Sequence, residues 1–246
     1  MRIIRRVARH GVIGTLKLVP TNLRNCFRKL EASQRAARRR DREFDLRYGT
    51  RTSGRIPVGG LDVTGENVDH AVDYEPISPE SFNIMMRFVP PDLTNFRFID
   101  YGSGLGRALL LASLYPFKEI IGVEFSALMH RQAERNLRKF RPPERVCSNA
   151  KSLLMDAALF SPPPGPTIFF FNNPFGRELM ATALQRINNV HRTSASPLYL
   201  LYGHPYQQGL LTESPFWAKL SGSGDEWAVF VRADDLNGGA VISDKW

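Results

Sequence analysis

The stretch FIDYGSGLGR, residues 98–107, decides how this chain folds. It begins with a mainly apolar run typical of a β-strand, continues into a turn with three alternating glycines, and leads into an apolar helical pattern. Glycine lacks a β-carbon, so the backbone of the turn can bend sharply and approach a ligand closely. The first N–H groups of the following helix have no partner inside the helix. The stretch therefore predicts a strand, a nucleotide-binding loop and a helix, in that order.

The glycine spacing separates two kinds of nucleotide ligand. A dinucleotide site needs Gly-x-Gly-x-x-Gly, whose third glycine would fall on Arg107, whereas the pattern here is Gly-x-Gly-x-Gly. Asp100 stands just before the turn, where its charge would repel a pyrophosphate. S-adenosylmethionine (SAM) has no phosphate and carries a cationic sulfonium, so a neighbouring anion is tolerated. The loop favours SAM over a nicotinamide dinucleotide.

A carboxylate follows the loop at the distance expected for a nucleoside site. Residues 120–124 read IIGVE, so Glu124 ends the second predicted strand about 20 residues beyond the loop. A carboxylate at this point can accept hydrogen bonds from both ribose hydroxyls. The loop and the glutamate are independent features, and their coincidence strengthens the prediction.

From residue 95 onward, β-rich runs alternate with helical patterns, which is typical of a mainly parallel sheet with helices on both faces. The expected strands are Phe96–Tyr101, Glu119–Glu124, Arg145–Ser148, Thr167–Asn172, Pro197–Tyr202, Phe216–Ser221 and Glu226–Arg232. The expected helices are Pro79–Phe88, Leu105–Leu114, Ser126–Phe140 and Arg177–Val190, with Ser126 as an N-cap. The run SGSG at 221–224 predicts an antiparallel hairpin. The predicted fold is α/β and Rossmann-like: a seven-stranded, mainly parallel sheet with a C-terminal antiparallel hairpin.

The motif DYGSGLG (100–106) with Glu124 resembles motif I and its acidic follower in class I SAM-dependent methyltransferases. More narrowly, LLLAS (109–113) and IGVEFS (121–126) are similar to a widespread bacterial group of methyltransferase-domain proteins, many of unassigned substrate. Upstream, FDLRYG (44–49) and YEP (74–76) also look like that group, and resemble segments before motif I in non-SET protein-lysine methyltransferases. The resemblance implies a seven-stranded methyltransferase domain with SAM as cofactor.

The same resemblance implies a set of cofactor-binding residues. Tyr74 and Glu75 would form a flap over the cofactor, or only a turn in a loop, and the sequence leaves both readings open. Where the family often has an Asp after the third strand to hold the adenine amine, this chain reads CSN at 147–149, and Asn149 offers an uncharged carbonyl oxygen. The predicted cofactor-binding residues are Tyr74, Glu75, Asp100, Gly102, Ser103, Gly104, Gly106, Glu124, Phe125 and Asn149.

The methyl acceptor is expected beside the fourth strand, which leads into NNPF at 172–175. This segment resembles the Asn-Pro-Pro-aromatic motif of methyltransferases that act on planar or primary amines. In that motif an Asn oxygen accepts a hydrogen bond from the amine, and the ring packs on the substrate. Three readings stay open. Asn172 orients the amine with Asn173 in place of a proline, or Asn173, Pro174 and Phe175 form a shortened motif, or the segment only turns the chain.

Positive charge is concentrated at the N-terminus. The formal net charge is +9, and residues 1–50 hold 14 Lys and Arg against 4 Asp and Glu, which leaves the remaining chain near neutral. Apolar residues recur at helical spacing between Leu16 and Leu30. We therefore predict a basic helical extension over residues 1–47 and a SAM-dependent methyltransferase domain over 48–246. The Arg35–Arg42 arm either packs with a solvated basic face or contacts a polyanion.

Composition argues against other chemistry. Cys26 and Cys147 are the only cysteines and the histidines lack ligand spacing, so neither a disulfide framework nor a metal site is expected. No stretch approaches the roughly 20 apolar residues of a transmembrane helix, and no signal-peptide pattern follows the N-terminus, so we expect a cytoplasmic protein.

The sequence therefore predicts a SAM-dependent methyltransferase acting on an amine nitrogen of a protein or a small molecule. Alternatives are a nucleic-acid methyltransferase, which the basic arm favours, and a SAM-binding or partner-binding protein without turnover. The identity of the acceptor cannot be predicted from these residues.

Overall fold

The computed structural model describes residues 35, 36, 38–57 and 72–237. The chain divides into two compact units, Met1–Glu43 and Phe44–Trp246. Among the described residues, no helix combines the length and the apolar character that a membrane span requires.

The first unit contains part of the predicted basic extension. Its described residues are helical, and Arg39 Nε donates to Glu43 Oε1 at 2.7 Å along this helix. The apolar residues predicted between Leu16 and Leu30 lie outside the described residues. Phe44 and Asp45, which we assigned to the extension, belong to the second unit. The predicted domain boundary after residue 47 stays a prediction.

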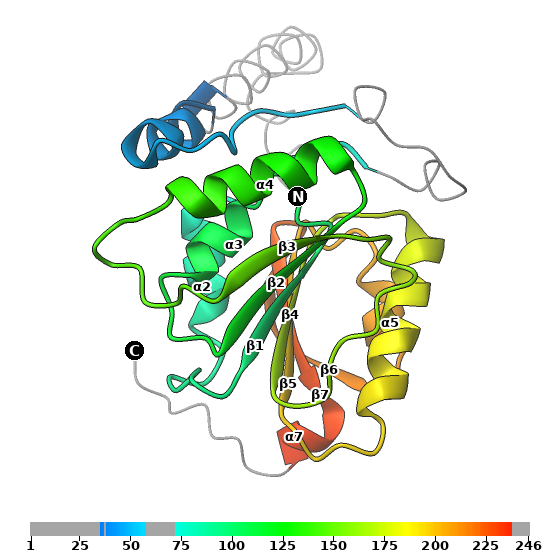
Figure 1. The fold of residues 1–246 in the computed structure, drawn as a ribbon. Helices are drawn as coiled ribbons and strands as arrows, with labels where there is room; N and C mark the ends of the chain where they lie inside the picture. The colour runs from blue at the N-terminus through cyan, green and yellow to red at the C-terminus, as the bar shows by residue number, and fades with distance from the viewer. Residues whose placement is uncertain (1–34, 37, 58–71, 238–246) are drawn as a thin grey trace, which may run out of the picture. The chain divides into compact units, whose positions relative to one another are not determined.

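A seven-stranded sheet forms the centre of the second unit (Figure 1). Its order is β3-β2-β1-β4-β5-β7-β6. The first five strands pair in parallel, and β7 pairs antiparallel with both β5 and β6, which confirms the predicted C-terminal hairpin. The strands are β1 Arg97–Tyr101, β2 Glu119–Glu124, β3 Ala150–Leu154, β4 Thr167–Asn172, β5 Leu198–Gly203, β6 Trp217–Ser223 and β7 Trp227–Arg232.

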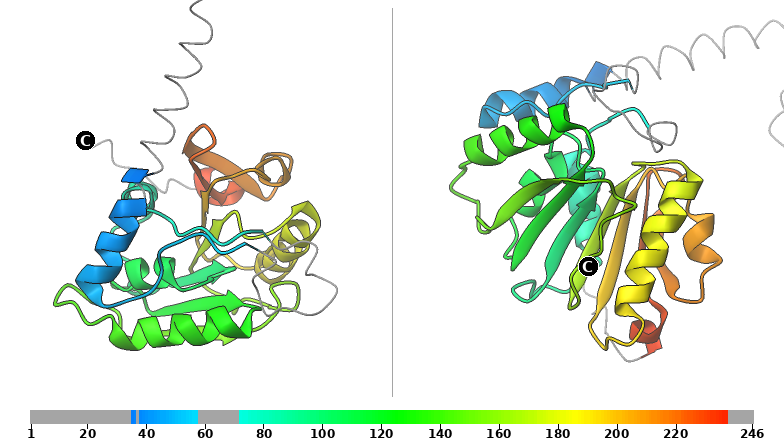
Figure 2. Two further views of the ribbon diagram at one scale, coloured as in Figure 1. Left: turned by 90° about the horizontal axis from the view of Figure 1, so that it is seen from above. Right: turned by 45° about the vertical axis from the view of Figure 1, so that its right-hand side comes forward.

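Helices cover both faces of this sheet, and the two views of Figure 2 show the same layers. The side chains of α2, α3 and α4 pack on one face, and those of α5 and α6 on the other. Ser126 caps α4 as predicted, because its side chain accepts from the Met129 N–H at 3.2 Å. The helices are α2 Pro79–Met86, α3 Arg107–Ala112, α4 Ala127–Lys139, α5 Arg177–His191, α6 Gly209–Thr212 and α7 Ala233–Asn237.

The middle strand, β4, supplies side chains to both hydrophobic layers. Successive residues of a strand point to opposite faces. Phe170 therefore packs toward α2, with its ring centroid 5.7 Å from that of Phe82. Phe171 lies on the other face and stacks on Tyr101 at 4.9 Å. A strand buried on both faces needs a continuous apolar run, which explains the sequence TIFFFN.

The third strand is not where the sequence predicted it. The prediction of residues 145–148 is wrong, since β3 spans Ala150–Leu154. Residues 145–148 instead belong to the connection between α4 and β3. The N–H groups of Val146 and Cys147 both donate to the carbonyl of Ser113, at the end of α3, at 3.0 Å. Val146 is 61% exposed. The prediction took a β-branched side chain in an exposed connection for part of a strand. As a result, it also misidentified the residues that follow β3.

Candidate functional site

Two adjoining cavities open at the carboxyl ends of β1, β2 and β4. The first has an empty volume of about 610 Å³ and lies among the glycine loop, residues 72–77 and residues 172–175. The second, of about 310 Å³, is mainly apolar and is lined by Val123, Met155, Ala157 and Leu179, among others. Gly102, Phe125 and Phe175 line both. This is the edge at which α/β sheets bind ligands.

The glycine loop has a backbone that only glycine adopts without strain. Gly102, Gly104 and Gly106 have φ angles of +73°, +52° and +84°. A β-carbon at Gly102 would lie 2.4 Å from Pro174 Cβ, and one at Gly104 would lie 2.3 Å from the Tyr74 ring. The loop therefore lets two segments far away in the sequence approach its backbone.

Glu124 ends β2 beside this loop, and its carboxylate is fixed by the backbone. Its Oε2 accepts from the Gly104 N–H at 2.7 Å and its Oε1 from the Ser126 N–H at 2.8 Å. The side chain is only 3% exposed. A carboxylate oxygen has two lone pairs, so one that accepts a single hydrogen bond can in general accept another. The predicted carboxylate is thus held in a single orientation.

Asp100 lies in the wall of the same cavity. Its burial, and secondarily the charge of Glu124, raise the pKa of Asp100 well above its ordinary value. Burial and a second carboxylate nearby both disfavour the ionised form of a carboxyl group. Asp100 therefore contributes to the cavity a carboxyl group whose charged form is disfavoured.

Tyr74 and Glu75 both line the first cavity. The Tyr74 ring lies against Gly104, and its hydroxyl donates to the Thr52 carbonyl at 2.7 Å. Glu75 is exposed, and its backbone carbonyl accepts a hydrogen bond from β4. Residues 74 and 75 are thus hydrogen-bonded to two different parts of the chain, Thr52 and Asn172.

Residues 172–175 also line that cavity. Asn172 Nδ2 donates to the Glu75 carbonyl at 2.7 Å, while its Oδ1 is buried against Gly203 without a hydrogen-bond partner among the described residues. Asn173 has a left-handed backbone, with φ +45°. Phe175 is buried and packs edge-on against Phe171. The two asparagines, equivalent in the sequence, therefore have different surroundings.

Asn149 is far from both cavities, contrary to the prediction. It precedes β3 rather than following it, and its Nδ2 donates to the Lys118 carbonyl at the opposite edge of the sheet. The carboxylate that follows the carboxyl end of β3 and lines the second cavity is that of Asp156. The sequence contains the signal, a carboxylate shortly after a β-strand, but the misplaced strand concealed it.

Comparisons with known proteins bear on the fold. No protein-family model and no curated protein sequence matches the chain. The human methyltransferase 10 domain-containing protein superposes with a TM-score of 0.50 at 12% identity, over 81% of this chain and 97% of that chain. Magnesium protoporphyrin IX methyltransferase from Synechocystis, solved with bound SAM, gives 0.43 at 14% identity, over 63% and 79%. A TehB-like SAM-dependent methyltransferase from Corynebacterium glutamicum gives 0.44 at 15% identity, over 64% and 89%.

The superposition on the human protein agrees with the features described above. It includes most of both chains, and the sheet of this protein has parallel strands followed by an antiparallel pair at one end. The glycine loop and Glu124 lie where a sheet of this type binds ligands. The chain has the fold of the class I SAM-dependent methyltransferases.

Proposed function

We propose that this chain is a SAM-dependent methyltransferase that transfers a methyl group to an amine nitrogen of a protein or a small molecule, and that it acts in the cytoplasm. The observation that carries the proposal is the Glu124 carboxylate, held by two backbone N–H groups beside three left-handed glycines. When bound, SAM supplies a methyl group already activated by its sulfonium. The protein then needs to bind, align and desolvate the reactants.

The residues present fit the parts of SAM. Glu124 has acceptor capacity for the ribose hydroxyls, and the apolar second cavity suits the adenine ring, with Asp156 as an acceptor for its amine. The glycine loop and Tyr74 would enclose the methionine end. Asp100 would meet its positive charge. These roles replace the one predicted for Asn149.

On the acceptor side, the contacts favour the shortened motif. Because the Asn172 amide is bonded to the Glu75 carbonyl, we assign Asn172 to fastening residues 74 and 75 onto β4. Asn173 would then accept the hydrogen bond from the amine, with Pro174 and Phe175 shaping the wall on which the substrate packs.

Calorimetry with SAM and with NAD tests the cofactor assignment. We expect micromolar binding of SAM alone. Glu124→Ala is expected to weaken SAM binding by about 1–3 kcal/mol through lost charge-assisted hydrogen bonds. The matched control is Glu119→Ala at the other end of the same strand, which should leave SAM binding unchanged. Preferential binding of NAD would overturn the proposal.

Labelled methyl transfer into fractionated lysate tests turnover and identifies the acceptor class. Label in protein or in small amines supports the proposal, and label only in nucleic acid contradicts the amine assignment. If SAM binds but no fraction is labelled, the protein is a SAM-binding protein without turnover.

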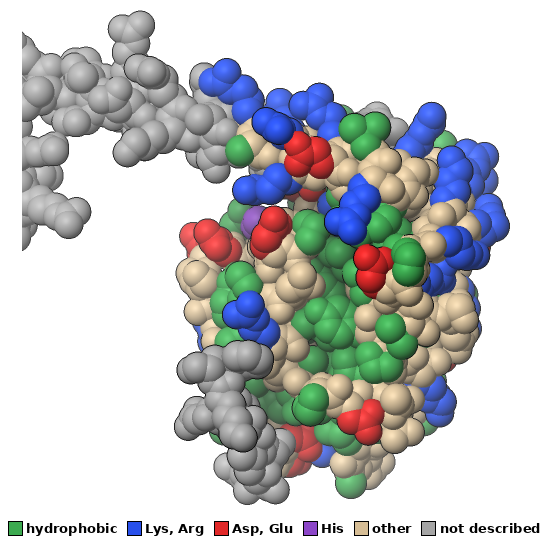
Figure 3. Space-filling model, turned by 90° about the vertical axis from the view of Figure 1, so that its left-hand side faces the viewer, with side chains coloured by type: hydrophobic (Ala, Val, Ile, Leu, Met, Phe, Trp, Pro, Cys, Tyr) green, Lys and Arg blue, Asp and Glu red, His purple; other side chains and the backbone are tan. Residues whose placement is uncertain are grey.

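One observation favours a nucleic-acid acceptor as the second candidate. Basic side chains gather on the exposed face of α4, and Figure 3 shows Lys and Arg (blue) grouped along one edge of the face it presents. The exposed basic residues of α4 are Arg131, Arg135, Arg138 and Lys139. If this face binds nucleic acid, affinity should fall steeply with salt and should weaken in a variant with these four residues replaced by Gln.

A further inference from the structure

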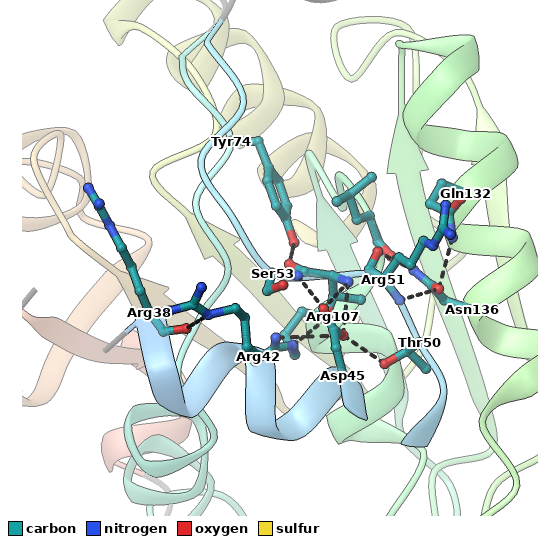
Figure 4. Close-up of polar contacts among 12 residues, drawn as sticks. Arg38, Arg42, Asp45, Thr50, Arg51, Ser53, Tyr74, Arg107, Gln132 and Asn136 are labelled. Atoms are coloured by element: carbon teal, nitrogen blue, oxygen red, sulfur yellow. Dashed lines mark hydrogen bonds and ion pairs between the residues drawn. The ribbon is translucent and has the colours of Figure 1, made fainter. Parts of the chain in front are cut away.

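A segment far before the glycine loop in the sequence is connected to it by a network of polar contacts, among them those of the largely buried carboxylate of Asp45 (Figure 4). We call residues 44–57 the strap. Asp45 accepts hydrogen bonds from the Thr50 hydroxyl at 2.8 Å, from the Thr52 N–H and hydroxyl, and from the Ser53 N–H at 2.7 Å. Burial raises the pKa of Asp45, but these hydrogen bonds outweigh it, so the net pKa lies below the ordinary value. The Asp45 carboxylate therefore holds residues 50–53 of the strap in a turn around it.

Arg107 connects this carboxylate to the first turn of α3. Its side chain is 1% exposed, its Nε donates to Thr52 Oγ1 at 2.5 Å, and its Nη2 lies 4.0 Å from Asp45 Oδ1. Its guanidinium carbon lies 4.1 Å from the centroid of the Phe44 ring. A buried cation is costly unless it is paired and hydrogen-bonded, so these contacts fix the strap to the residue that directly follows the glycine loop.

Asn136 of α4 provides a second attachment. Its Oδ1 accepts from the Arg51 N–H at 2.9 Å, and its Nδ2 donates to the carbonyls of Arg51 and Leu105. Asn136 is fully buried. The strap is thus bonded on two sides to the loop that would hold the cofactor (Figure 4).

The strap in turn holds Tyr74. The Tyr74 hydroxyl donates to the Thr52 carbonyl, and the backbones of Ile56 and Tyr74 exchange two hydrogen bonds of 2.9 and 3.1 Å. The Tyr74 ring lies over Gly104, in the wall of the first cavity. A continuous set of contacts therefore runs from Asp45 and Arg107 through Thr52 to the ring that covers the loop.

We propose that Asp45 and Arg107 are positioning residues for SAM: they hold the strap so that Tyr74 covers the methionine end of the cofactor. This inference rests on the proposed function. It explains why an arginine occupies the position of the third dinucleotide glycine. Its guanidinium faces the strap, and the loop gains a cover in place of a diphosphate site.

Calorimetric SAM affinities of strap variants test the proposal. Arg107→Met and Asp45→Asn are expected to weaken binding about 10-fold, since each removes a buried charged partner. Tyr74→Phe, which removes only the bond to Thr52, should cost about 3-fold. Arg107→Lys keeps the charge but not the planar fork and should fall between wild type and Arg107→Met.

The matched control is Arg97→Met. Arg97 is also partly buried and paired, with Glu119 at 3.3 Å, but at the amino end of β1, away from both cavities. The Arg97→Met variant should have a lower melting temperature than wild type and an unchanged SAM affinity. If Arg107→Met does not fold, Arg107→Lys and Tyr74→Phe carry the test.

The outcomes separate three cases. Weaker binding in all strap variants supports the proposal. Weaker binding in Arg107→Met, with Asp45→Asn and Tyr74→Phe unchanged, would mean that Arg107 contacts SAM directly and overturns the positioning role, as would wild-type affinity in every strap variant. If wild type itself fails to bind SAM, the proposed function fails, and this inference fails with it.

Tryptic cleavage gives a readout that a purely structural role would not move. Arg51 and Arg55 are exposed on the strap. SAM should slow cleavage after these residues in wild type and in Arg97→Met, as measured by mass spectrometry, and should not do so in Arg107→Met or Asp45→Asn. Equal protection by SAM in all four proteins would contradict the proposal.

Discussion

The two sides of the cleft are built differently, and we name them by the roles proposed for them: the cofactor half at the ends of β1 and β2, and the acceptor half at the ends of β4 and β5. At the ends of β1 and β2, the left-handed positions are glycines, and Glu124 is satisfied by backbone N–H groups. At the ends of β4 and β5 stand Asn173 and His204, with φ +45° and +48°, the two left-handed residues other than glycine in the described part of the chain. At the same end of β4, the buried Oδ1 of Asn172 has no hydrogen-bond partner within the described ranges.

This difference indicates what each half is built for. A loop of glycines reaches its conformation at little cost, so the cofactor half is preformed. Left-handed Asn and His store strain, and an unpaired buried acceptor costs free energy. Such features persist where function requires them, so we expect the acceptor half to adjust when its substrate binds.

The largest loss of SAM affinity should come from a substitution that creates a steric clash between the two halves. Gly102→Ala would place a β-carbon 2.4 Å from Pro174 Cβ at a left-handed position. We expect SAM affinity to fall about 100-fold or more, because strain and displacement of Pro174 together cost about 3 kcal/mol. Calorimetry measures this. Gly224→Ala, also left-handed but with no atom within 4 Å, is the control. Equal losses in both variants would show that strain alone is responsible.

Asn173→Ala should damage the acceptor half alone. If Asn173 orients the amine, single-turnover transfer should slow about 30-fold while the SAM dissociation constant is unchanged. Asn95→Ala, at an exposed position before β1, should leave both quantities at wild-type values. A slower rate in Asn172→Ala but not in Asn173→Ala would return the role to Asn172.

The adenine assignment can be tested with two variants at opposite ends of β3. Asp156→Ala should weaken SAM binding about 10-fold, because a carboxylate acceptor is lost from the second cavity. Asn149→Ala should have no effect on affinity. The reverse result would restore the prediction made from the sequence.

The smallest expected effect is on pH dependence. The raised pKa of Asp100 keeps this carboxyl neutral below that pKa and anionic above it. Since the anion attracts the cationic ligand, SAM affinity should rise with pH through this range, with proton release on binding. Asp100→Asn should flatten the profile measured by calorimetry in buffers of different ionisation enthalpy. An unchanged profile in that variant would assign the titration to another group.

The sequence predicted the first two strands and the loop between β1 and α3 well because their signals are local. The glycine loop, Glu124 and the strands that position them lie within residues 97–124, and their spacing alone specifies the geometry. The positions of the remaining strands along the chain followed from the alternation of β-rich and helical patterns, with β3 as the exception because Val146 is apolar yet exposed.

The acceptor half and the strap could not be predicted in the same way. Asn172 and Asn173 are alike in sequence, and the hydrogen bond that distinguishes Asn172 goes to the Glu75 carbonyl, 97 residues away. The Arg107–Thr52 bond joins residues 55 apart. From the sequence, Arg107 indicates only that the third glycine of a dinucleotide motif is absent, because no neighbouring residue reveals that its side chain bonds to Thr52.

The position of β4 links these regions mechanically. It is the fourth of seven strands, and its phenylalanines belong to both hydrophobic layers. Neither layer of helices can detach without exposing one side of this strand to water. Its amides should therefore be the last in the protein to exchange with deuterium, and the first cavity, which Phe170 and Asn172 of this strand line, should keep that wall fixed while the surrounding loops move.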